Sequence, residues 1–438
     1  MRRWWVRLLA GLVVVALLLV AAVYIVSNTD WGRERVRRYV LNLIQSNSHG
    51  IVHIGSVTGN LLHGVTLHDV VITDSARAPF VKADEIWANY SLLTLRGKKL
   101  QFSHVKLVRP VIVIDRQPGG KWNYDRIFPR DTTTHTGKKP NGWGTWIRFS
   151  DVTVVDGDLA VRSPWSPDES LTLLQKNDAI RRALGPEGRL AVVQVRGGYQ
   201  KVSTFHKINA LFPLVRLEDP AYKTRLIDVA ALKMIAEPFR PPVADVRGLT
   251  GTFEFTGDSV WWKGARAAFP ATKLSGDGRY YINNGNMHLR LHADPVDPSD
   301  VRWAMVNLPE QGSGKLDFGL DWVGKKSVYT LQNMNVTLVR SHVTGQVEVT
   351  VTDTLAYRNG DLHFTTLDTQ LLTKLFPTMK FPRPLTLTGQ AKFNGVEHSL
   401  AVNADVTVDD RLSGRSHLVA NGTMGLANGI FNAKDLHV

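Results

Sequence analysis

The sequence contains no cysteine, so disulfide bonds, thiolate metal sites and cysteine nucleophiles are excluded. Catalytic motifs are missing as well. There is neither a Gly-x-Ser-x-Gly nucleophile elbow nor a His-Glu-x-x-His zinc helix, and the carboxylates are scattered along the chain. We therefore predict that the protein is not an enzyme and that it binds neither a metal nor a cofactor.

Two local patterns resemble ligand sites but lack what those sites need. Residues 319–326 have the spacing of a phosphate-binding loop, yet Lys326 stands where Mg²⁺ requires a serine or threonine, and the flanking segments alternate like hairpin strands. His288 and His292 share one face of a predicted strand, but at this separation they lie about 13 Å apart, too far for one metal ion. We interpret the loop as a hairpin turn and the histidines as solvated surface residues.

Basic residues outnumber acidic ones, with 53 Lys and Arg against 39 Asp and Glu and a formal net charge of +14. This charge favours an anionic partner, and lipid headgroups, acidic glycans and nucleic acid all qualify. Because the basic residues are dispersed rather than clustered, we do not expect nucleic-acid binding.

Apolar runs of membrane-spanning length are absent except near the N-terminus, where residues 8–26 carry no charge. At about 1.5 Å per residue this run can cross the ~30 Å hydrocarbon core of a bilayer, so we predict an uncleaved transmembrane anchor. Residues 31–48 follow as a predicted basic amphipathic helix, which could lie on anionic headgroups or cap the first strands. The residues predicted at the membrane interface are Arg2, Arg3, Trp4, Trp5, Arg33, Arg35, Arg37 and Arg38.

After Gly50 the apolar residues recur with a period of two, which predicts antiparallel strands with one apolar and one polar face. Helices are few, and we expect short ones over residues 178–184, 298–306 and 368–376. Residues 130–144 and 213–242 are predicted to be irregular. Dipeptides that accept positive φ angles are predicted to form the tight turns: Asp156-Gly157, Asn284-Gly285, Asn359-Gly360, Asn421-Gly422 and Asn428-Gly429.

An internal similarity indicates a repeated design. Residues 102–110 (FSHVKLVRP) and 149–157 (FSDVTVVDG) match at the Phe, the Ser and the first valine, and both end at a turn-forming residue. The predicted organisation is an N-terminal segment and anchor (1–30), a basic helix (31–48), an N-terminal β module (49–130), an irregular insertion with strands (131–245) and an extended amphipathic sheet (246–438).

Several strings occur together in the first third of the chain. They are residues 32–34 (GRE) after the anchor, 54–70 (IGSVTGNLLHGVTLHDV), 90–93 (YSLL), 105–113 (VKLVRPVIV) and 120–123 (GKWN). In this order they closely resemble the start of the AsmA-like superfamily, especially TamB-type proteins. The resemblance covers about residues 1 to 130; beyond them only the strand-rich character agrees.

The resemblance implies a single-pass protein of the Gram-negative inner membrane, with a cytoplasmic N-terminus and a periplasmic body. That body would be an elongated, curved, mainly antiparallel β-sheet that forms an open groove, related to the chorein-type bridges that carry lipids between membranes. Phospholipids would be the ligands, and the role would lie in outer-membrane assembly and envelope homeostasis. TamB-type members also have an outer-membrane barrel partner, but the C-terminal domain of those members is not recognisable in this sequence.

If the sheet forms an open groove, the apolar alternate residues would line it and acyl chains would cover them. The alternative is a structural β-solenoid or interaction scaffold in the cell envelope, in which the same residues form a closed core and no lipid is conducted. The predicted lining comprises Phe253, Phe255, Met287, Leu289, Leu291, Leu316, Phe318, Leu320, Val347, Val349, Leu385, Leu387, Phe393, Val402 and Val406.

Overall fold

The fold is known from a computed structural model, which divides the chain into two compact units, Met1–Lys223 (unit 1) and Thr224–Val438 (unit 2). The structure describes residues 29, 34, 35, 37, 38, 42, 48–60, 64–91, 94, 96–127, 146–375, 381, 383–427 and 430–437. Within these residues, none of the helices combines the length and the apolar character that crossing a membrane requires. The predicted anchor, residues 8–26, lies outside the described residues.

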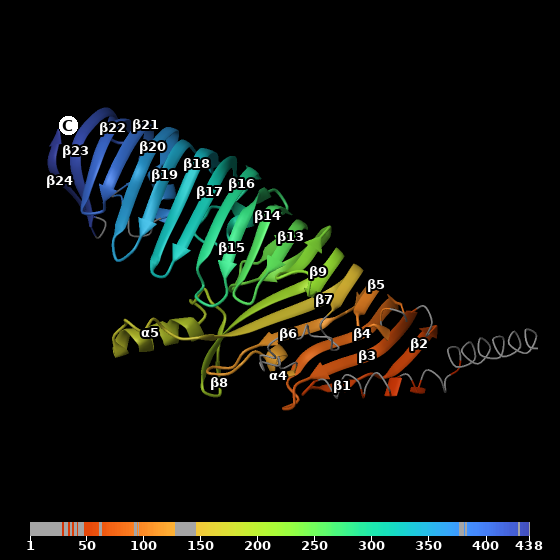
Figure 1. Ribbon diagram of the computed structural model, residues 1–438. Coiled ribbons are helices and arrows are strands. Elements are labelled where there is room, and N and C mark those ends of the chain that lie inside the picture. The colour runs from red at the N-terminus through yellow and green to blue at the C-terminus, as the bar shows by residue number, and fades with distance from the viewer. Residues whose placement is uncertain are drawn as a thin grey trace, which may run out of the picture. The chain divides into compact units, whose positions relative to one another are not determined.

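Unit 1 is a mixed sheet (Figure 1). Both β1 and β2 pair with β3, which pairs with β4; β4 pairs with β5 and β6. Both of these pair in parallel with β7, and the antiparallel strand β9 lies between β7 and β8. The elements are β1 (Ile51–His53), β2 (Ser56–Asn60), β3 (Gly64–Thr73), β4 (Pro79–Tyr90), β5 (Leu100–Val108), β6 (Val111–Asp115), α4 (Asn123–Ile127), β7 (Ile147–Trp165), α5 (Leu173–Leu184), β8 (Val192–Val195) and β9 (Gly198–Glu218).

The two similar segments lie side by side in unit 1. Strand β5 pairs with β7 in parallel so that Phe102 lies opposite Phe149, and their rings stack with centroids 5.5 Å apart. Both segments have a positive φ angle two residues after the Phe, 50° at His104 and 52° at Asp151. The repeated sequence therefore produces a repeated backbone irregularity, and such bulges increase the local twist of a sheet.

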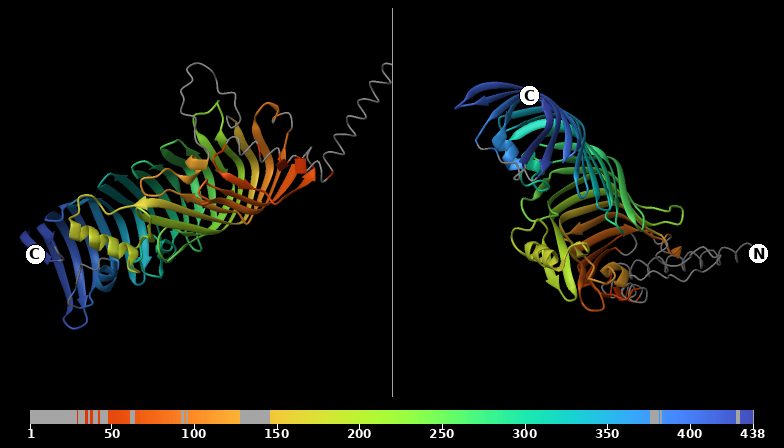
Figure 2. Two further views of the ribbon diagram at one scale, coloured as in Figure 1. Left: turned by 90° about the horizontal axis from the view of Figure 1, so that it is seen from below. Right: turned by 90° about the vertical axis from the view of Figure 1, so that its left-hand side faces the viewer.

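Unit 2 is an antiparallel sheet in which each strand from β13 to β24 pairs with the next (Figure 1). Strand β10 pairs with β13, and β11 and β12 form a hairpin. The sheet of this unit curves along its strands (Figure 2). The strands are β10 (Arg225–Val229), β11 (Ala231–Glu237), β12 (Ala244–Val246), β13 (Gly248–Phe255), β14 (Ser259–Ala268), β15 (Lys273–Tyr281), β16 (Met287–Val296), β17 (Gly312–Val323), β18 (Lys326–Leu338), β19 (Ser341–Val351), β20 (Leu355–Asp368), β21 (Thr386–Val396), β22 (Ser399–Asp410), β23 (Gly414–Ala427) and β24 (Ile430–His437).

Two short helices interrupt the run of hairpins in unit 2, and their attachments match. Helix α6 (Pro298–Val301) follows β16, and α7 (Thr369–Leu375) follows β20. At the first, the Thr272 hydroxyl accepts a hydrogen bond from the Asp297 amide at 2.8 Å. At the second, the Ser341 hydroxyl accepts from the Asp368 amide at 3.0 Å. Each helix is thus held at its start by a buried hydroxyl located two strands earlier.

The described fold confirms the predicted class, which is mostly β and mainly antiparallel with few short helices. The predicted helices occur, although α5 begins earlier, at Leu173, and α6 ends earlier, at Val301. The predicted hairpin around Gly324 also occurs, since β17 and β18 join there. The irregular structure predicted for residues 213–242 was wrong over most of that range, because β9 extends to Glu218 and is followed by β10 and β11. Residues 130–144 lie outside the described residues.

Three of the predicted tight turns are also wrong. Asp156-Gly157, Asn359-Gly360 and Asn421-Gly422 lie inside β7, β20 and β23. All three coincide with a shift in strand register, and φ is 53° at Asp156 and 51° at Asn359. A residue that accepts positive φ can form a bulge as readily as a turn, so these dipeptides bend strands instead of ending them. Asn284-Gly285 does join two strands, and Asn428-Gly429 lies outside the described residues.

Candidate functional site

The strand register of unit 2 brings the apolar alternate residues to one side of the sheet. Residues directly opposite in antiparallel strands have their side chains on the same face. One such row runs across eight successive strands, and we call the face that it lies on the apolar face. The row consists of Phe253, Trp262, Gly278, Leu289, Leu320, Tyr329, Val349 and Tyr357.

The predicted lining residues gather on this face. Parallel rows, such as Leu291 opposite Phe318 and Phe393 opposite Val402, extend it from β13 to β22. Leu385 is the one predicted lining residue that does not lie on a strand. It precedes β21, and its backbone exchanges hydrogen bonds with Thr369 at the start of α7. The structure thus shows where these side chains lie, while their contact with lipid stays a prediction.

The apolar face is only partly covered. In β16 and β21 exposure alternates strictly along most of the strand, with half-buried residues on the apolar face and exposed residues on the other. Among the described aromatic side chains of unit 2, only Phe364 is buried, with 7% of its surface exposed. The interior of a closed two-layer sandwich would bury many such side chains. The described part of unit 2 therefore supplies no second layer over the middle of this face.

A tyrosine and a phenylalanine from neighbouring strands meet on the apolar face. The rings of Tyr357 and Phe393 pack edge to face with centroids 5.9 Å apart. Burial, with a smaller contribution from Glu397, raises the pKa of Tyr357. The phenol is therefore neutral at physiological pH, and this part of the face carries no charge from it.

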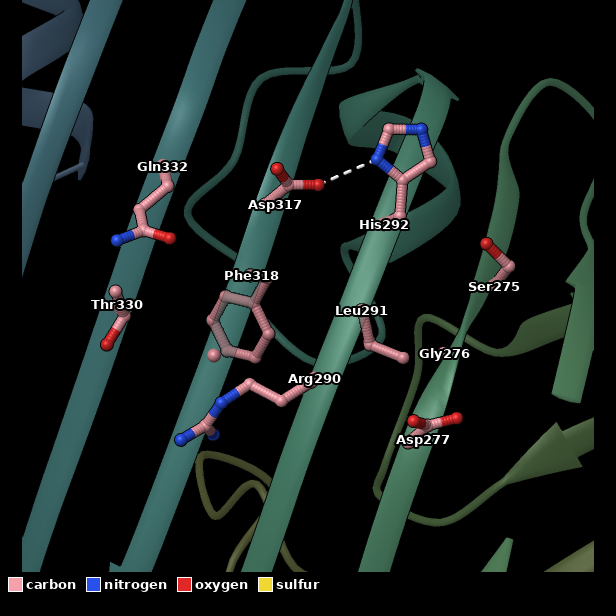
Figure 3. Close-up of a pocket in the computed structure, with 11 residues that line it drawn as sticks. Ser275, Gly276, Asp277, Arg290, Leu291, His292, Asp317, Phe318, Thr330 and Gln332 are labelled. Atoms are coloured by element: carbon pink, nitrogen blue, oxygen red, sulfur yellow. Dashed lines mark hydrogen bonds and ion pairs between the residues drawn. The ribbon is translucent and has the colours of Figure 1, made fainter. Parts of the chain in front are cut away.

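The opposite, polar face of unit 2 carries histidine–aspartate pairs between β16 and β17. His288 lies 2.8 Å from Asp321. His292 lies 2.6 Å from Asp317 (Figure 3). Hydrogen bonds from Arg290 and, less strongly, His288 hold the pKa of Asp321 below its ordinary value. Those from Asn333 and His292 lower the pKa of Asp317 in the same way.

A shallow depression of about 560 Å³ on the polar face is lined in part by the His292–Asp317 pair (Figure 3). Its polar lining includes Asp277, Arg290, Asp317 and Thr330. Nowhere in the described residues do three or more histidine or carboxylate side chains come together in a way that could hold a metal ion. As predicted, His288 and His292 stand on the same face, and each is paired with its own aspartate.

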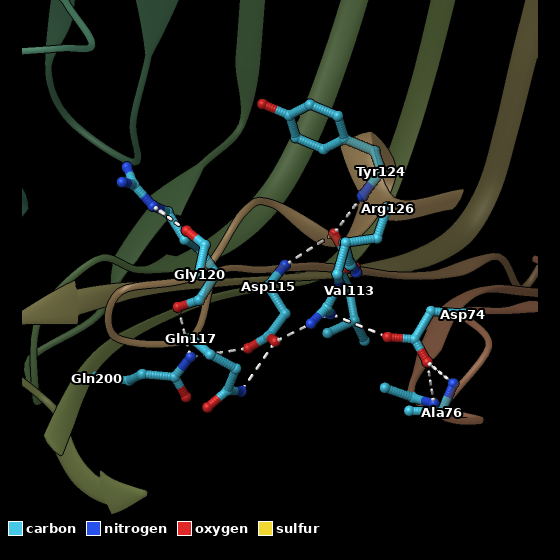
Figure 4. Close-up of polar contacts among 12 residues, drawn as sticks. Asp74, Ala76, Val113, Asp115, Gln117, Gly120, Tyr124, Arg126 and Gln200 are labelled. Atoms are coloured by element: carbon cyan, nitrogen blue, oxygen red, sulfur yellow. Dashed lines mark hydrogen bonds and ion pairs between the residues drawn. The ribbon is translucent and has the colours of Figure 1, made fainter. Parts of the chain in front are cut away.

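Unit 1 contains a buried polar cluster that the sequence analysis did not single out (Figure 4). Asn123, which is fully buried, donates to the Val113 carbonyl at 2.6 Å and accepts from the Asp115 amide at 3.1 Å. Arg126 lies 3.0 Å from Asp74 and 3.9 Å from Asp115. The cluster fastens α4 to β6 and to the turn after β3, so its role is structural. Its sequence signal was the string 120–123, which we used only for the resemblance.

The predicted membrane-interface residues are described only in part. Arg2, Arg3, Trp4, Trp5 and Arg33 lie outside the described residues, whereas Arg35, Arg37 and Arg38 are helical. Arg37 donates to the Glu34 carboxylate at 2.8 Å and to the Ile54 carbonyl at 2.8 Å. For this residue the contacts favour attachment of the helix to the first strands over contact with headgroups.

Comparisons with known proteins found no match to a family model, to a curated protein or to a solved structure.

Proposed function

We propose that this chain is an envelope lipid-transfer protein of the AsmA/TamB type, in which the acyl chains of phospholipids cover the apolar face of unit 2. The single observation that carries the proposal is that apolar residues continue from β13 to β22 without a second layer in the described structure. The resemblance of residues 1 to 130 to AsmA-like proteins supports the same function.

The size of the apolar face suits a path for lipid. Ten strands, β13 to β22, at a spacing of about 4.8 Å make a surface roughly 45 Å long, which exceeds the ~30 Å hydrocarbon thickness of a bilayer. Each CH₂ group removed from water on such a surface contributes about 0.8 kcal/mol. Because the residues of the row are apolar, an acyl chain that moves from one row to the next replaces apolar contacts with similar apolar contacts. Its free energy therefore changes little, and the charged headgroup stays in water.

The chemistry of the face favours acyl chains over a protein partner. A protein strand or helix laid on it would bring backbone amides and carbonyls, which need hydrogen-bond partners when they are buried. The row through Leu289 and Leu320 offers only apolar and aromatic side chains and the hydroxyls of Tyr329 and Tyr357. Hydrocarbon needs no such partners.

Site-specific photocrosslinking tests this proposal with two adjacent residues of β16. Leu289 lies on the apolar face and Arg290 on the polar face. The full chain, carrying benzoylphenylalanine at one or the other position, is irradiated in cells, and adducts are identified by mass spectrometry. We expect phospholipid adducts at position 289 and none at 290. Absence of adducts at 289, or equal labelling of both positions, would overturn the proposal.

The proposal includes a location: an anchor in the inner membrane, a cytoplasmic N-terminus and a periplasmic body. The supporting observation is the uncharged run of residues 8–26, since arginines on both flanks leave the charge rule indecisive. Protease added to spheroplasts should digest units 1 and 2 while a cytoplasmic marker stays intact. Protection of both units until the membrane is lysed would contradict this orientation.

A further inference from the structure

Two aromatic side chains on the apolar face of unit 2 lie across glycines of the neighbouring strand. Trp262 of β14 is directly opposite Gly278 of β15, and Phe393 of β21 is directly opposite Gly360 of β20. Neither glycine has a positive φ angle, so backbone conformation does not require glycine at either position. Their lack of a side chain must serve another purpose, and close approach of a neighbouring group is the usual one.

The space above each glycine is filled by the ring. A Cβ atom placed on Gly278 would overlap the Trp262 indole, with Cε2 only 2.6 Å away. A Cβ atom on Gly360 would lie 2.5 Å from Cε2 and 2.6 Å from Cδ2 of Phe393. At both glycines the three nearest atoms are ring atoms and none belongs to the backbone. A methyl group there would thus displace the ring, which can leave its place over the glycine by changing to another side-chain rotamer.

The direction of that movement matters for the face. Strand side chains stand roughly perpendicular to a sheet, and a ring that cannot lie over its neighbour would stand up from the apolar face. Trp262 would then project into the space where the proposed lipid lies, between β13 and β16. Phe393 would do the same between β20 and β22.

We propose that Gly278 and Gly360 are positioning residues, which hold Trp262 and Phe393 down against the sheet and thereby keep the lipid path open. This inference rests on the proposed function. The inference also says what limits the ligand. An acyl chain must pass over the Trp262 and Phe393 rings, and the two glycines leave it room because they let these rings lie flat on the sheet.

The test uses three reporter positions on the apolar face that are separated by the two pairs. Ile227 lies on the β10 side of the first pair, Leu320 lies between the pairs, and Val406 lies beyond the second. The full chain with benzoylphenylalanine at one reporter is reconstituted in vesicles that contain phosphatidylethanolamine with a fluorescent headgroup. Fluorescent adducts are then measured at each reporter.

We expect adducts at all three reporters in the otherwise unchanged protein. Gly278→Ala should block the path at Trp262, so that either Ile227 alone or Leu320 and Val406 together lose their adducts while the other side keeps them. Gly278→Ala combined with Trp262→Ala should restore adducts at all three reporters. Gly360→Ala should block the path at Phe393, so that the loss of adducts separates Val406 from Leu320 and Ile227. The matched control is Gly319→Ala, because Gly319 faces the polar side and a Cβ there would lie 3.2 Å from Thr330.

The outcomes separate this inference from the proposed function. If no reporter is labelled in the unchanged protein, the proposed function fails and this inference fails with it. If the reporters are labelled but Gly278→Ala and Gly360→Ala leave the pattern unchanged, only this inference is overturned. A merely structural role of the glycines would lower the unfolding temperature and weaken labelling evenly, and it too would overturn the inference. If Gly278→Ala does not fold, Gly360→Ala decides.

Discussion

Unit 1 and unit 2 bury different kinds of side chain, although both are built on long strands. The fully buried larger side chains of unit 1 are two apolar and two amide side chains, Ile54, Ile127, Asn123 and Gln200, and both Asn123 and Ile127 belong to α4. Those of unit 2 lie at strand ends and connections: Ser259, Thr272, Pro309, Ser341 and Thr369. Within the strands of unit 2, buried apolar side chains such as Leu320, Phe364 and Val406 keep 7 to 8% of their surface exposed.

Unit 1 thus covers its buried side chains with its own residues, whereas unit 2 leaves an apolar face that another molecule can cover. In unit 1 the polar side chains around α4 bond to other groups of the protein, as when Gln200 donates to Asp115 at 2.9 Å and to the Arg116 carbonyl at 2.7 Å. In unit 2 buried hydroxyls at strand ends hold the helices α6 and α7, and a small apolar cluster that includes Phe364 and Val406 is buried on the strands. The aromatic side chains of the apolar face other than Phe364 stay at least partly exposed among the described residues, which suits a face that a ligand covers.

The largest expected effect comes from placing a charge on the apolar face. Phe318→Glu should abolish phospholipid adducts at position 289 because a carboxylate beside Leu291 opposes acyl chains. The unfolding temperature should change little, since a half-buried position lets the carboxylate reach water. Adduct formation and circular dichroism melting measure the two effects. Gln332→Glu on the exposed polar face is the matched control and should retain the adducts.

A closed core would give the opposite result for this variant. If the apolar face is sealed, as in the solenoid or scaffold alternative, Phe318→Glu buries an unpaired charge and unfolds the unit. Loss of cooperative melting in Phe318→Glu, with Gln332→Glu unaffected, would therefore show that the apolar face of unit 2 is a closed core.

A smaller effect is expected in unit 1, and there on stability alone. Asn123→Ala leaves the Val113 carbonyl and the Asp115 amide without their partner, which should cost about 2 to 4 kcal/mol of unfolding free energy. Lipid adducts at position 289 should persist in the folded protein. Denaturant titration measures the loss, and Lys121→Ala at the neighbouring exposed position should change stability little. An effect of Asn123→Ala no larger than that of Lys121→Ala would show that the buried polar cluster does not stabilise unit 1.

The smallest effect concerns the polar face and pH. The pKa of Asp321 is lowered in the folded state, so its stabilising contribution is present above the ordinary Asp pKa of about 3.9 and is lost as pH falls through the folded value. Asp321→Asn should therefore lose less stability than the unchanged protein on acidification below about pH 4. Thermal melting across that range measures the difference, with Asp353→Asn in the β19–β20 connection as control. Equal acid sensitivity of all three proteins would show that the pair with Arg290 is too solvated to matter.

Much of the strand content followed from local patterns, and the failures have identifiable causes. The alternation of Met287, Leu289 and Leu291 predicted both the strand and its apolar side. The Asp156-Gly157 and Asn359-Gly360 dipeptides misled because positive φ serves bulges and turns alike. Nothing in the local pattern distinguishes the two, since the outcome depends on whether the neighbouring strand continues alongside.

Long-range pairing escaped prediction for a different reason. The similarity of residues 102–110 and 149–157 indicated a repeat, but it did not show that the two segments are parallel neighbours in register. The burial of Asn123 was equally out of reach, because its partners Val113 and Asp115 lie on a strand that only the fold places beneath α4. The close fit of Trp262 over Gly278 likewise depends on the register of β14 with β15.

The sequence by itself determined that unit 2 has one apolar and one polar face, because side chains alternate along a strand whatever surrounds it. It also determined the hairpin at Gly324, where the flanking alternation left no room for a helix. Only the tertiary structure decided that the rows of neighbouring strands join into one continuous face and that no second layer covers its middle in the described residues. Periodicity is a property of each strand alone, whereas coverage depends on what the rest of the chain leaves against it.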